Sequence, residues 1–515
     1  MYPARIAASD GVPRYERHQP EKTLLYQIIK EYYPPFLAHM ERQGRSLPLY
    51  VQREFDDYLE CGRLEHGFFR VRCEDCHHER LVAFSCKHRG ICPSCGARRM
   101  AESAALLVDD VLPHQPIRQW VLSFPFPLRF LLASYPELMG KVLGIVQRVL
   151  STHLIGKAGF TRAVAKTGAV TLIQRFGSAL NLNLHFHMLV LDGVYVENDY
   201  GGLRFHRVKA PNVDELRTLV HAISHRVARF LEKRGFLERD AESTYLALEP
   251  DDDDAMAQLQ GHSITYRIAV GPQQGRKVFT LQTLPPDEDD SGGSDRVAKE
   301  AGFSLHAGVS TEAHQREKLE RLCRYVSRPA VSEKRLAITS NGNIRYQLKT
   351  PYRDGTTHVI FEPLDFIAKL AALVPKPRTN LTRFHGVFAP NSKFRVRVTP
   401  AKRGRGRKRR QPTEESWLDK TPAERHQSMT WMQRLKRVFN IDIETCERCA
   451  GQVKIIACIE GPAVIERILS HLNDKAPSDD PVMLPEDWAP PQAWLGAPAF
   501  STDSLTPRSP LLPRL

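Results

Sequence analysis

Apolar and polar residues alternate cleanly from residue 181 to residue 190, which reads NLNLHFHMLV. This alternation predicts a β-strand with two different faces. One face carries His185 and His187, whose α-carbons should lie roughly 6.5–7 Å apart because a strand rises about 3.3 Å per residue. The other face, which we expect to pack on a core, is made by Leu182, Leu184, Phe186, Met188 and Val190.

Two imidazoles on one face of a strand can converge on one metal ion. The pattern alone is not specific, because twenty histidines in 515 residues give about one His-x-His by chance. A pair of hydrogen-bonded strand histidines therefore remains the alternative to a metal site.

The same periodicities predict an α+β fold in which an antiparallel sheet is flanked by helices. A hairpin should join the strand at 168–176 to the histidine strand through Gly177 and Ser178. We expect further strands at 117–124, 263–270 and 277–284 and strand pairs within 336–360. Helices are predicted at 24–32 (ending at Pro34 and Pro35), 51–59, 97–112, 137–154, 213–231, 312–326, 365–374, 421–439 and 463–472.

Changes in composition suggest the domain organisation. We expect a helical and zinc-ribbon-like N-terminal domain at 21–100, an α+β core at 101–398 and a small C-terminal CxxC module at 413–475. Residues 1–20 and 476–515 should be disordered, 399–412 should be a basic linker, and 249–254 and 285–295 should be acidic loops.

The sequence contains three CxxC pairs, whereas random placement of its ten cysteines would give roughly 0.2 such pairs. Cys73 and Cys76 precede Cys92 and Cys95, and these four thiolates are predicted to hold one structural Zn²⁺. Neighbouring residues offer a second site or a substitute ligand, and none is favoured singly: Cys61, His66, His77, His78, Cys86 and His88.

The third pair, Cys446 and Cys449, is a weaker candidate for a metal site. Its best additional partners along the sequence are Cys458 and His471, and a turn without metal is an equal alternative.

A net charge of +14 favours a polyanionic partner, most plausibly nucleic acid. The arginines of the cysteine-rich segment, including Arg98 and Arg99, are expected to contact DNA phosphates. The sequence shows neither a signal peptide nor an apolar run long enough to span a membrane. We therefore expect a cytoplasmic protein, associated with the nucleoid through DNA, whose cysteines bind metal and do not form disulfides.

The predicted helix at 312–326 supplies a candidate nucleophile. Tyr325 lies off its apolar stripe, and Lys318, Arg321 and Arg328 lie beside it. A tyrosine bordered by cations can meet a phosphate and attack it. An ordinary half-buried tyrosine is the alternative.

These motifs, taken in order, resemble the rolling-circle insertion-sequence transposases that contain an HUH nuclease domain. The resemblance runs from about residue 20 to residue 475 and is carried by CGRLEHGFFRVRCEDC, FSCKHRGICPSCGARRMAE, NLHFHMLVLDGVY, RYVSRP, RFHGVFAPNSKFR and CERCAGQVKIIACIEGPAVIERIL. Some members carry two tyrosines four residues apart. Residue 321 is arginine here, so the chain resembles the single-tyrosine branch.

The resemblance implies an enzyme that nicks single-stranded DNA at the ends of its element and transfers the strand. His185 and His187 would hold Mg²⁺ or Mn²⁺, and Tyr325 would form a 5′-phosphotyrosine and leave a free 3′-hydroxyl. A third ligand is expected, with Gln174, Glu317 and Glu320 as candidates. The alternatives are a plasmid replication initiator or relaxase and a non-enzymatic, zinc-dependent DNA-binding protein.

Overall fold

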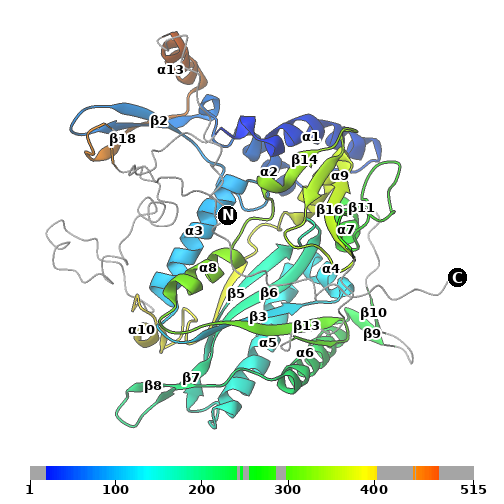
Figure 1. Ribbon diagram of the computed structural model, residues 1–515, viewed down its shortest axis with the longest axis vertical. Helices are drawn as coiled ribbons and strands as arrows, with labels where there is room; N and C mark the ends of the chain where they lie inside the picture. Colours follow the sequence, from blue (N-terminus) through cyan, green and yellow to red (C-terminus); the bar gives the residue numbers. More distant parts are fainter. Residues whose placement is uncertain are drawn as a thin grey trace, which may run out of the picture.

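The computed structural model describes residues 19–239, 244–247, 254–285, 297–402, 445–446 and 448–474. Most of the expectations for the chain ends, the acidic loops, the basic linker and the helix at 421–439 fall outside these residues. The predicted α+β class is confirmed, because antiparallel sheets and helices build the molecule (Figure 1).

The central element is a six-stranded sheet in which every neighbouring pair is antiparallel. Its strand order is β12-β13-β3-β6-β5-β17. The strands are β12 (Val297–Glu300), β13 (Phe303–Thr311), β3 (Ile117–Ser123), β6 (Leu182–Leu191), β5 (Gly168–Phe176) and β17 (Thr382–Gly386). The predicted hairpin of β5 and β6 is confirmed, and it places the histidine strand in the interior of the sheet.

Helices cover both faces of this sheet. On one face α5 (Pro136–Lys157) and α6 (Val213–Lys233) pack on the apolar side of β6, as the alternation predicted. On the other face lie α3 (Pro93–Ala105), the π-helical turn at Leu106–Val111 and α8 (Arg316–Val326). Figure 1 shows α5 and α6 below the sheet and α3 and α8 above it. The histidine face of β6 is therefore covered by helices.

A second layer joins the N-terminal helices to the remaining strands. The helices α1 (Leu24–Arg42), α2 (Leu49–Glu60), α4 (Phe126–Ser134), α7 (Ala255–Ile264) and α9 (Pro363–Leu373) are part of it or border it. Its four-stranded sheet has the order β11-β16-β15-β14. These strands are β11 (Phe279–Gln282), β16 (Thr356–Phe361), β15 (Ile344–Gln347) and β14 (Leu336–Ile338).

The C-terminal segment is part of the N-terminal domain and not the separate module that we expected. Strand β18 (Val453–Ile459) pairs with β1 (Phe68–Cys73), which also pairs with β2 (Glu79–Ala83). Figure 1 shows orange β18 beside the blue β2 hairpin, with α13 (Pro462–Asp474) at one end. Smaller elements are β4 (Ala165–Lys166), β7 (Gly193–Glu197), β8 (Leu203–Arg207), β9 (Leu237–Arg239), β10 (Thr244–Leu246) and α10 (Arg395–Val398).

Two local expectations were wrong. Helix α1 does not end at Pro34 and Pro35 but continues to Arg42, because Phe36 and Met40 extend its buried face. That burial outweighs the roughly 3 kcal/mol that a proline costs inside a helix. The expected strand at 263–270 is instead the end of α7 and a loop, because the Asp254 carboxylate accepts hydrogen bonds from two backbone N–H groups and starts a helix there.

A buried ion pair holds β3 to the end of β6. The Arg118 guanidinium donates to both carboxylate oxygens of Asp192 over 2.9 and 2.8 Å, and to the Ala307 carbonyl over 3.0 Å. Ala307 lies at the irregularity in β13, where the ladder with β3 shifts register. The pair therefore ties three elements of the central sheet together.

We expect Asp192→Ala to lower the free energy of unfolding by about 3–5 kcal/mol, because it leaves the Arg118 charge buried without its partner. Chemical denaturation of the full chain measures this loss. The control is Glu312→Ala, which removes an exposed ion pair with Arg207 and should cost less than about 1 kcal/mol. Equal losses for the two variants would contradict the role given to the buried pair.

Candidate active site and metal centres

The two histidines of β6 converge on one point. His185 Nε2 lies 3.1 Å from His187 Nε2, and two metal–nitrogen bonds of about 2.1 Å that meet at a right angle span about 3 Å. The two side chains are 6% and 1% exposed. The separation of their nitrogens suits two ligands of one metal ion.

Hydrogen bonds at the opposite ring nitrogens orient both imidazoles. His185 Nδ1–H donates to the Asn183 carbonyl over 2.8 Å, which leaves Nε2 free as a ligand. The Gln119 side-chain N–H donates to His187 Nδ1 over 2.7 Å. A half-turn of that amide would present its oxygen to Nδ1–H instead and leave His187 Nε2 unprotonated, as a metal ligand requires. Sequence reasoning did not single out Gln119, although a glutamine inside the apolar strand IRQWVLS was a signal.

Burial keeps both imidazoles neutral. It lowers the pKa of His185 to about 4, with smaller contributions from the charges of Arg328 and Arg129. Burial also lowers the pKa of His187 well below its usual value, and the nearby His185 and Arg328 lower it further. Neutral imidazole is the form that binds a metal ion.

Tyr325 is brought to this pair from a segment that lies far away in the sequence. Its ring centroid is 6.2 Å from that of His187, and the ring planes stand at 84°. The last turn of α8 is held against β5 by a hydrogen bond of 3.3 Å, in which the Gln174 side-chain N–H donates to the Val326 carbonyl. The structure thus brings the predicted nucleophile and the predicted metal ligands together.

Tyr325 is only 6% exposed, although it lies off the apolar stripe of α8. Among the described residues no hydrogen bond engages its hydroxyl. That oxygen is nevertheless not sealed from solvent, unlike the hydroxyls of Tyr33, Tyr58 and Tyr346. The phenol therefore packs its ring and keeps its reactive oxygen accessible.

Of the three candidates for a third ligand, Gln174 is the one beside the histidines. It lies directly opposite His185 across the β5–β6 ladder, so both side chains point to the same face. Its Oε1 is buried and makes no hydrogen bond among the described residues. The Ser123 hydroxyl, which faces His185 from β3, is in the same state. Orphaned oxygens around two converging nitrogens fit a divalent cation.

The other two candidates point elsewhere. Glu317 is 94% exposed and lies 3.9 Å from Arg321. Glu320 accepts a hydrogen bond of 2.6 Å from Arg324. Within the described part of the chain, no group of three or more His, Cys, Asp or Glu ligand atoms includes the histidine pair.

The cationic residues that the sequence predicted to bind DNA lie in three places. Arg328 covers the Tyr325 ring, with its guanidinium carbon 4.3 Å from the ring centroid. Lys318 and Arg321 lie on the exposed part of α8, toward its N-terminal end. On α3, which packs against α8, Arg98 pairs with Glu102 and Arg99 donates to the Lys87 carbonyl.

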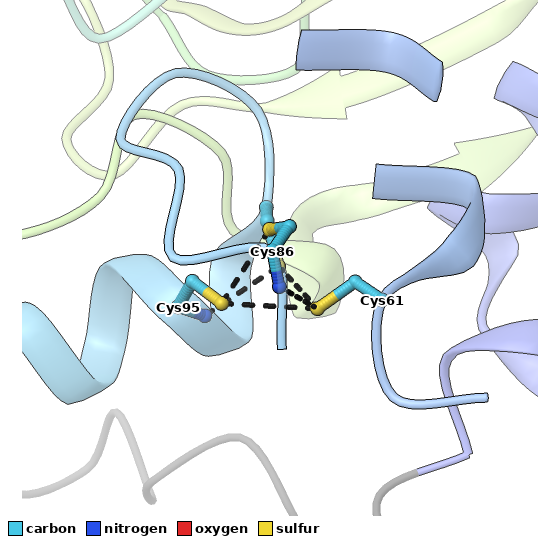
Figure 2. A group of neighbouring side chains, drawn as sticks. Cys61, Cys86 and Cys95 are labelled. Carbon is cyan, nitrogen blue, oxygen red and sulfur yellow. Dashed lines mark hydrogen bonds between the residues drawn. The ribbon is translucent and has the colours of Figure 1, made fainter. Parts of the chain in front are cut away.

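Eight cysteines form two clusters, and this grouping corrects the predicted one. In the first cluster (Figure 2), Cys61 Sγ lies 3.8 Å from Cys92 Sγ and 3.7 Å from Cys95 Sγ, and Cys86 Sγ lies 3.5 Å from Cys95 Sγ. Four sulfurs around Zn²⁺ stand about 3.8 Å apart when each Zn–S bond is about 2.3 Å. Cys61 and Cys86 were predicted only as possible second-site or substitute ligands, because neither belongs to a CxxC pair.

The second cluster joins parts of the chain that are 370 residues apart. Cys73 Sγ lies 3.5 Å from Cys449 Sγ, and Cys76 Sγ lies 3.4 Å from Cys446 Sγ. The β1–β18 ladder brings the two knuckles together. Cys446 and Cys449 thus find partners in the N-terminal hairpin and not in Cys458 or His471. Both clusters have the donor set of a closed structural zinc site.

The first cluster is built into the support of the Tyr325 helix. Cys92 is the residue that precedes α3, and its sulfur accepts from the Cys95 backbone N–H over 3.5 Å. A Cβ on Gly96 would approach the Pro329 Cβ to 2.7 Å, so glycine permits this close contact. Pro329 follows Arg328 directly, which places the cysteine cluster beside the end of α8.

Comparisons with known families agree with these observations. A family model described as "Putative transposase" matches residues 168–395, and one described as "Transposase zinc-binding domain", of the IS91 type, matches residues 28–124. The two matches identify the chain as a transposase with an IS91-type zinc-binding domain, and a transposase acts on DNA. Neither the curated proteins nor the solved structures gave a significant match.

The matched ranges divide between the two kinds of site. The transposase match contains the histidine pair, Gln174 and Tyr325, and the zinc-binding match contains all the N-terminal cysteines. Cys446 and Cys449 lie outside both ranges. No helix among the described residues is long and apolar enough to cross a membrane.

We expect the purified full chain to hold two tightly bound zinc ions. Cys95→Ser should remove the ion of the first cluster and Cys446→Ser that of the second, because each change breaks a four-thiolate shell. Elemental analysis of the purified variants measures the zinc content. Cys458→Ser is the control, since this exposed cysteine belongs to neither cluster. A wild-type content of one zinc ion would contradict the two-site arrangement.

Proposed function

We propose that this transposase nicks single-stranded DNA at the ends of its element and transfers the strand through a covalent phosphotyrosine. The observation that carries the proposal is the 6.2 Å approach of the Tyr325 ring to the His187 ring. His187 lies on β6 and Tyr325 on α8. The packing of these two elements does not by itself require two histidines with converging nitrogens beside a tyrosine whose oxygen is accessible. The arrangement supports the HUH-type reaction that the sequence resemblance implies.

In this reaction the Tyr325 oxygen attacks the scissile phosphorus and loses its proton to solvent. The new P–O bond joins Tyr325 to the 5′ side of the break, and the P–O3′ bond breaks. The 3′ oxygen leaves and takes up a proton as a free 3′-hydroxyl. The number of phosphoester bonds is unchanged, so the link can later be exchanged for a new 3′-hydroxyl without another energy source.

The protein's part is mainly positioning. His185 and His187, with Gln174 as a third ligand, would hold Mg²⁺ or Mn²⁺, which when bound polarises a phosphate oxygen and neutralises charge. Gln174 also fixes the end of α8 through the Val326 carbonyl. One side chain thus sets both the ligand shell and the distance to the phenol. Such fixed geometry supplies much of the rate in phosphoryl transfer.

The closure of the site favours a single strand over a duplex. Tyr325 is only 6% exposed, and the Arg328 guanidinium and the Lys349 ammonium lie over its ring. A scissile phosphate must therefore enter among side chains, which an unpaired and flexible strand does more easily than a stiff duplex.

We expect the wild-type chain with Mn²⁺ to form a covalent adduct with a single-stranded oligonucleotide that carries the element's end. Tyr325→Phe and His187→Ala should each abolish the adduct, because one lacks the nucleophile and the other a ligand. Denaturing electrophoresis with a labelled strand measures it. Tyr200→Phe is the control, since Tyr200 is 97% exposed. An undiminished adduct in Tyr325→Phe would refute Tyr325 as the nucleophile.

If adduct formation occurs, its dependence on metal concentration tests Gln174. We expect Gln174→Ala to raise the Mn²⁺ concentration for half-maximal adduct formation by about 10–100-fold, in the range found when groups that support a metal site are removed. Gln347→Ala, at an exposed position of β15, is the matched control. An unchanged Mn²⁺ requirement would exclude Gln174 as a ligand.

A further inference from the structure

Three cations from three different segments lie near one another, and two of them lie over the Tyr325 ring. Arg328 follows α8, Arg335 ends the short 3₁₀ turn at Glu333–Arg335, and Lys349 lies just beyond β15. The Lys349 Nζ is 4.6 Å from the Tyr325 ring centroid, and the Arg328 guanidinium carbon is 4.3 Å from it. Sequence reasoning had found Arg328 alone, since only the fold brings the other two to the site.

This group of cations has no compensating acid. Within the part of the chain that the structure describes, no carboxylate pairs with any of the three. Partial removal from water, together with the charges of Arg328 and Arg335, lowers the pKa of the Lys349 ammonium to about 8. Burial likewise lowers the pKa of Arg335, and its Nη1 is buried without a hydrogen-bond partner. Cations that repel each other in a partly dry place need an anion.

Two of the cations are held in place by aromatic rings. The Arg328 guanidinium lies over both Tyr325 and Phe176, 5.4 Å from the centroid of the latter. Arg335 lies 4.7 Å from the centroid of Tyr346. The Arg328 Nη1–H also donates to the Tyr325 carbonyl over 3.1 Å, which fixes this guanidinium further. A stacked guanidinium whose direction is fixed suits recognition of a planar or tetrahedral oxyanion through its other N–H groups.

We propose that Arg328, Arg335 and Lys349 form an anion cradle that binds a backbone phosphate of the single-stranded DNA next to the scissile bond. The cradle borders the Tyr325 ring, so a phosphate held there would fix the strand in register with the phenol. The binding is to phosphate and is independent of base sequence. This inference deepens the proposed function, and it rests on single-stranded DNA being the substrate.

The test measures binding without cleavage. The full chain carrying Tyr325→Phe is titrated with a fluorescent oligothymidine at several salt concentrations and without added divalent ion. We expect Lys349→Gln and Arg335→Gln in this background each to weaken binding about tenfold. Each should also make the slope of log K against log salt shallower by about 0.7, the value for one phosphate contact on a single strand.

The matched control is Arg345→Gln, which removes the same charge from an exposed position of β15. It should leave the affinity within about twofold and the salt slope unchanged. Zinc content, measured for every variant, shows whether the fold is retained. Salt slopes that stay at the control value in folded Lys349 and Arg335 variants would overturn the cradle.

A second measurement needs no substitution in the cradle. Labelling by an amine-reactive reagent near pH 8, followed by peptide mass spectrometry, reports how accessible the Lys349 amine is. We expect oligothymidine to protect Lys349 severalfold and to leave Lys334, an exposed neighbour of Arg335, unprotected. Equal labelling of Lys349 with and without DNA at saturation would also refute the cradle.

The outcomes separate this inference from the proposed function. Loss of binding in the cradle variants without any adduct in the wild type would support the cradle and refute the nuclease. An adduct that forms in the wild type while cradle variants bind normally would do the opposite.

Discussion

The register of β6 between β3 and β5 is the constraint on which the site depends. Because side chains alternate along a strand, a slip of one residue would turn both histidines into the apolar layer beneath α5 and α6. The pairing of His185 with Gln174 on one side and Ser123 on the other fixes that register. It also puts the ligands and the orphaned oxygens on the face that α8 covers. The packing of the apolar face of β6 thus determines the position of the histidine face.

The cysteine clusters extend this constraint to segments that have little core of their own. The first cluster lies at the end of the loop that leads into α3. The contact of Gly96 with Pro329 then fixes the end of α8 relative to this cluster. The second closes the β18–β1 edge, where a strand from the far end of the chain completes the N-terminal hairpin. Metal-binding thiolate clusters would stabilise the fold of these segments, as a larger hydrophobic core stabilises other domains. This arrangement makes the zinc-binding domain a support for α8 as well as a candidate DNA-binding surface.

Sequence reasoning succeeded where a local period or spacing reports a local structure, and it failed where the fold joins distant segments. The alternation of β6 predicted both of its faces, and the order of the motifs predicted the family. The cysteine grouping was wrong because a CxxC pair shows that two sulfurs share a site but not which other pair completes it. The burial of Tyr325 could not be read from helical periodicity, because it results from the contact of the last turn of α8 with β5 and from Arg328 and Lys349 over the ring. Lys349 and Arg335 had no local signal, since each is an ordinary surface residue until the second layer packs against α8.

Burial has different effects on the protonation of the imidazole and guanidinium groups at this site. An imidazole taken out of water gives up its proton, as the lowered pKa values of His185 and His187 show, and so takes the form that can bind a metal ion. A guanidinium cannot lose its proton at any ordinary pH, so Arg328 and Arg335 stay charged, without a carboxylate partner among the described residues. Lys349, with a pKa of about 8, lies between these limits, and a bound phosphate would keep it protonated. The surroundings of Tyr325 therefore offer neutral nitrogens suited to a cation and positive charge suited to an anion, and a phosphodiester bound through a metal ion would bring both.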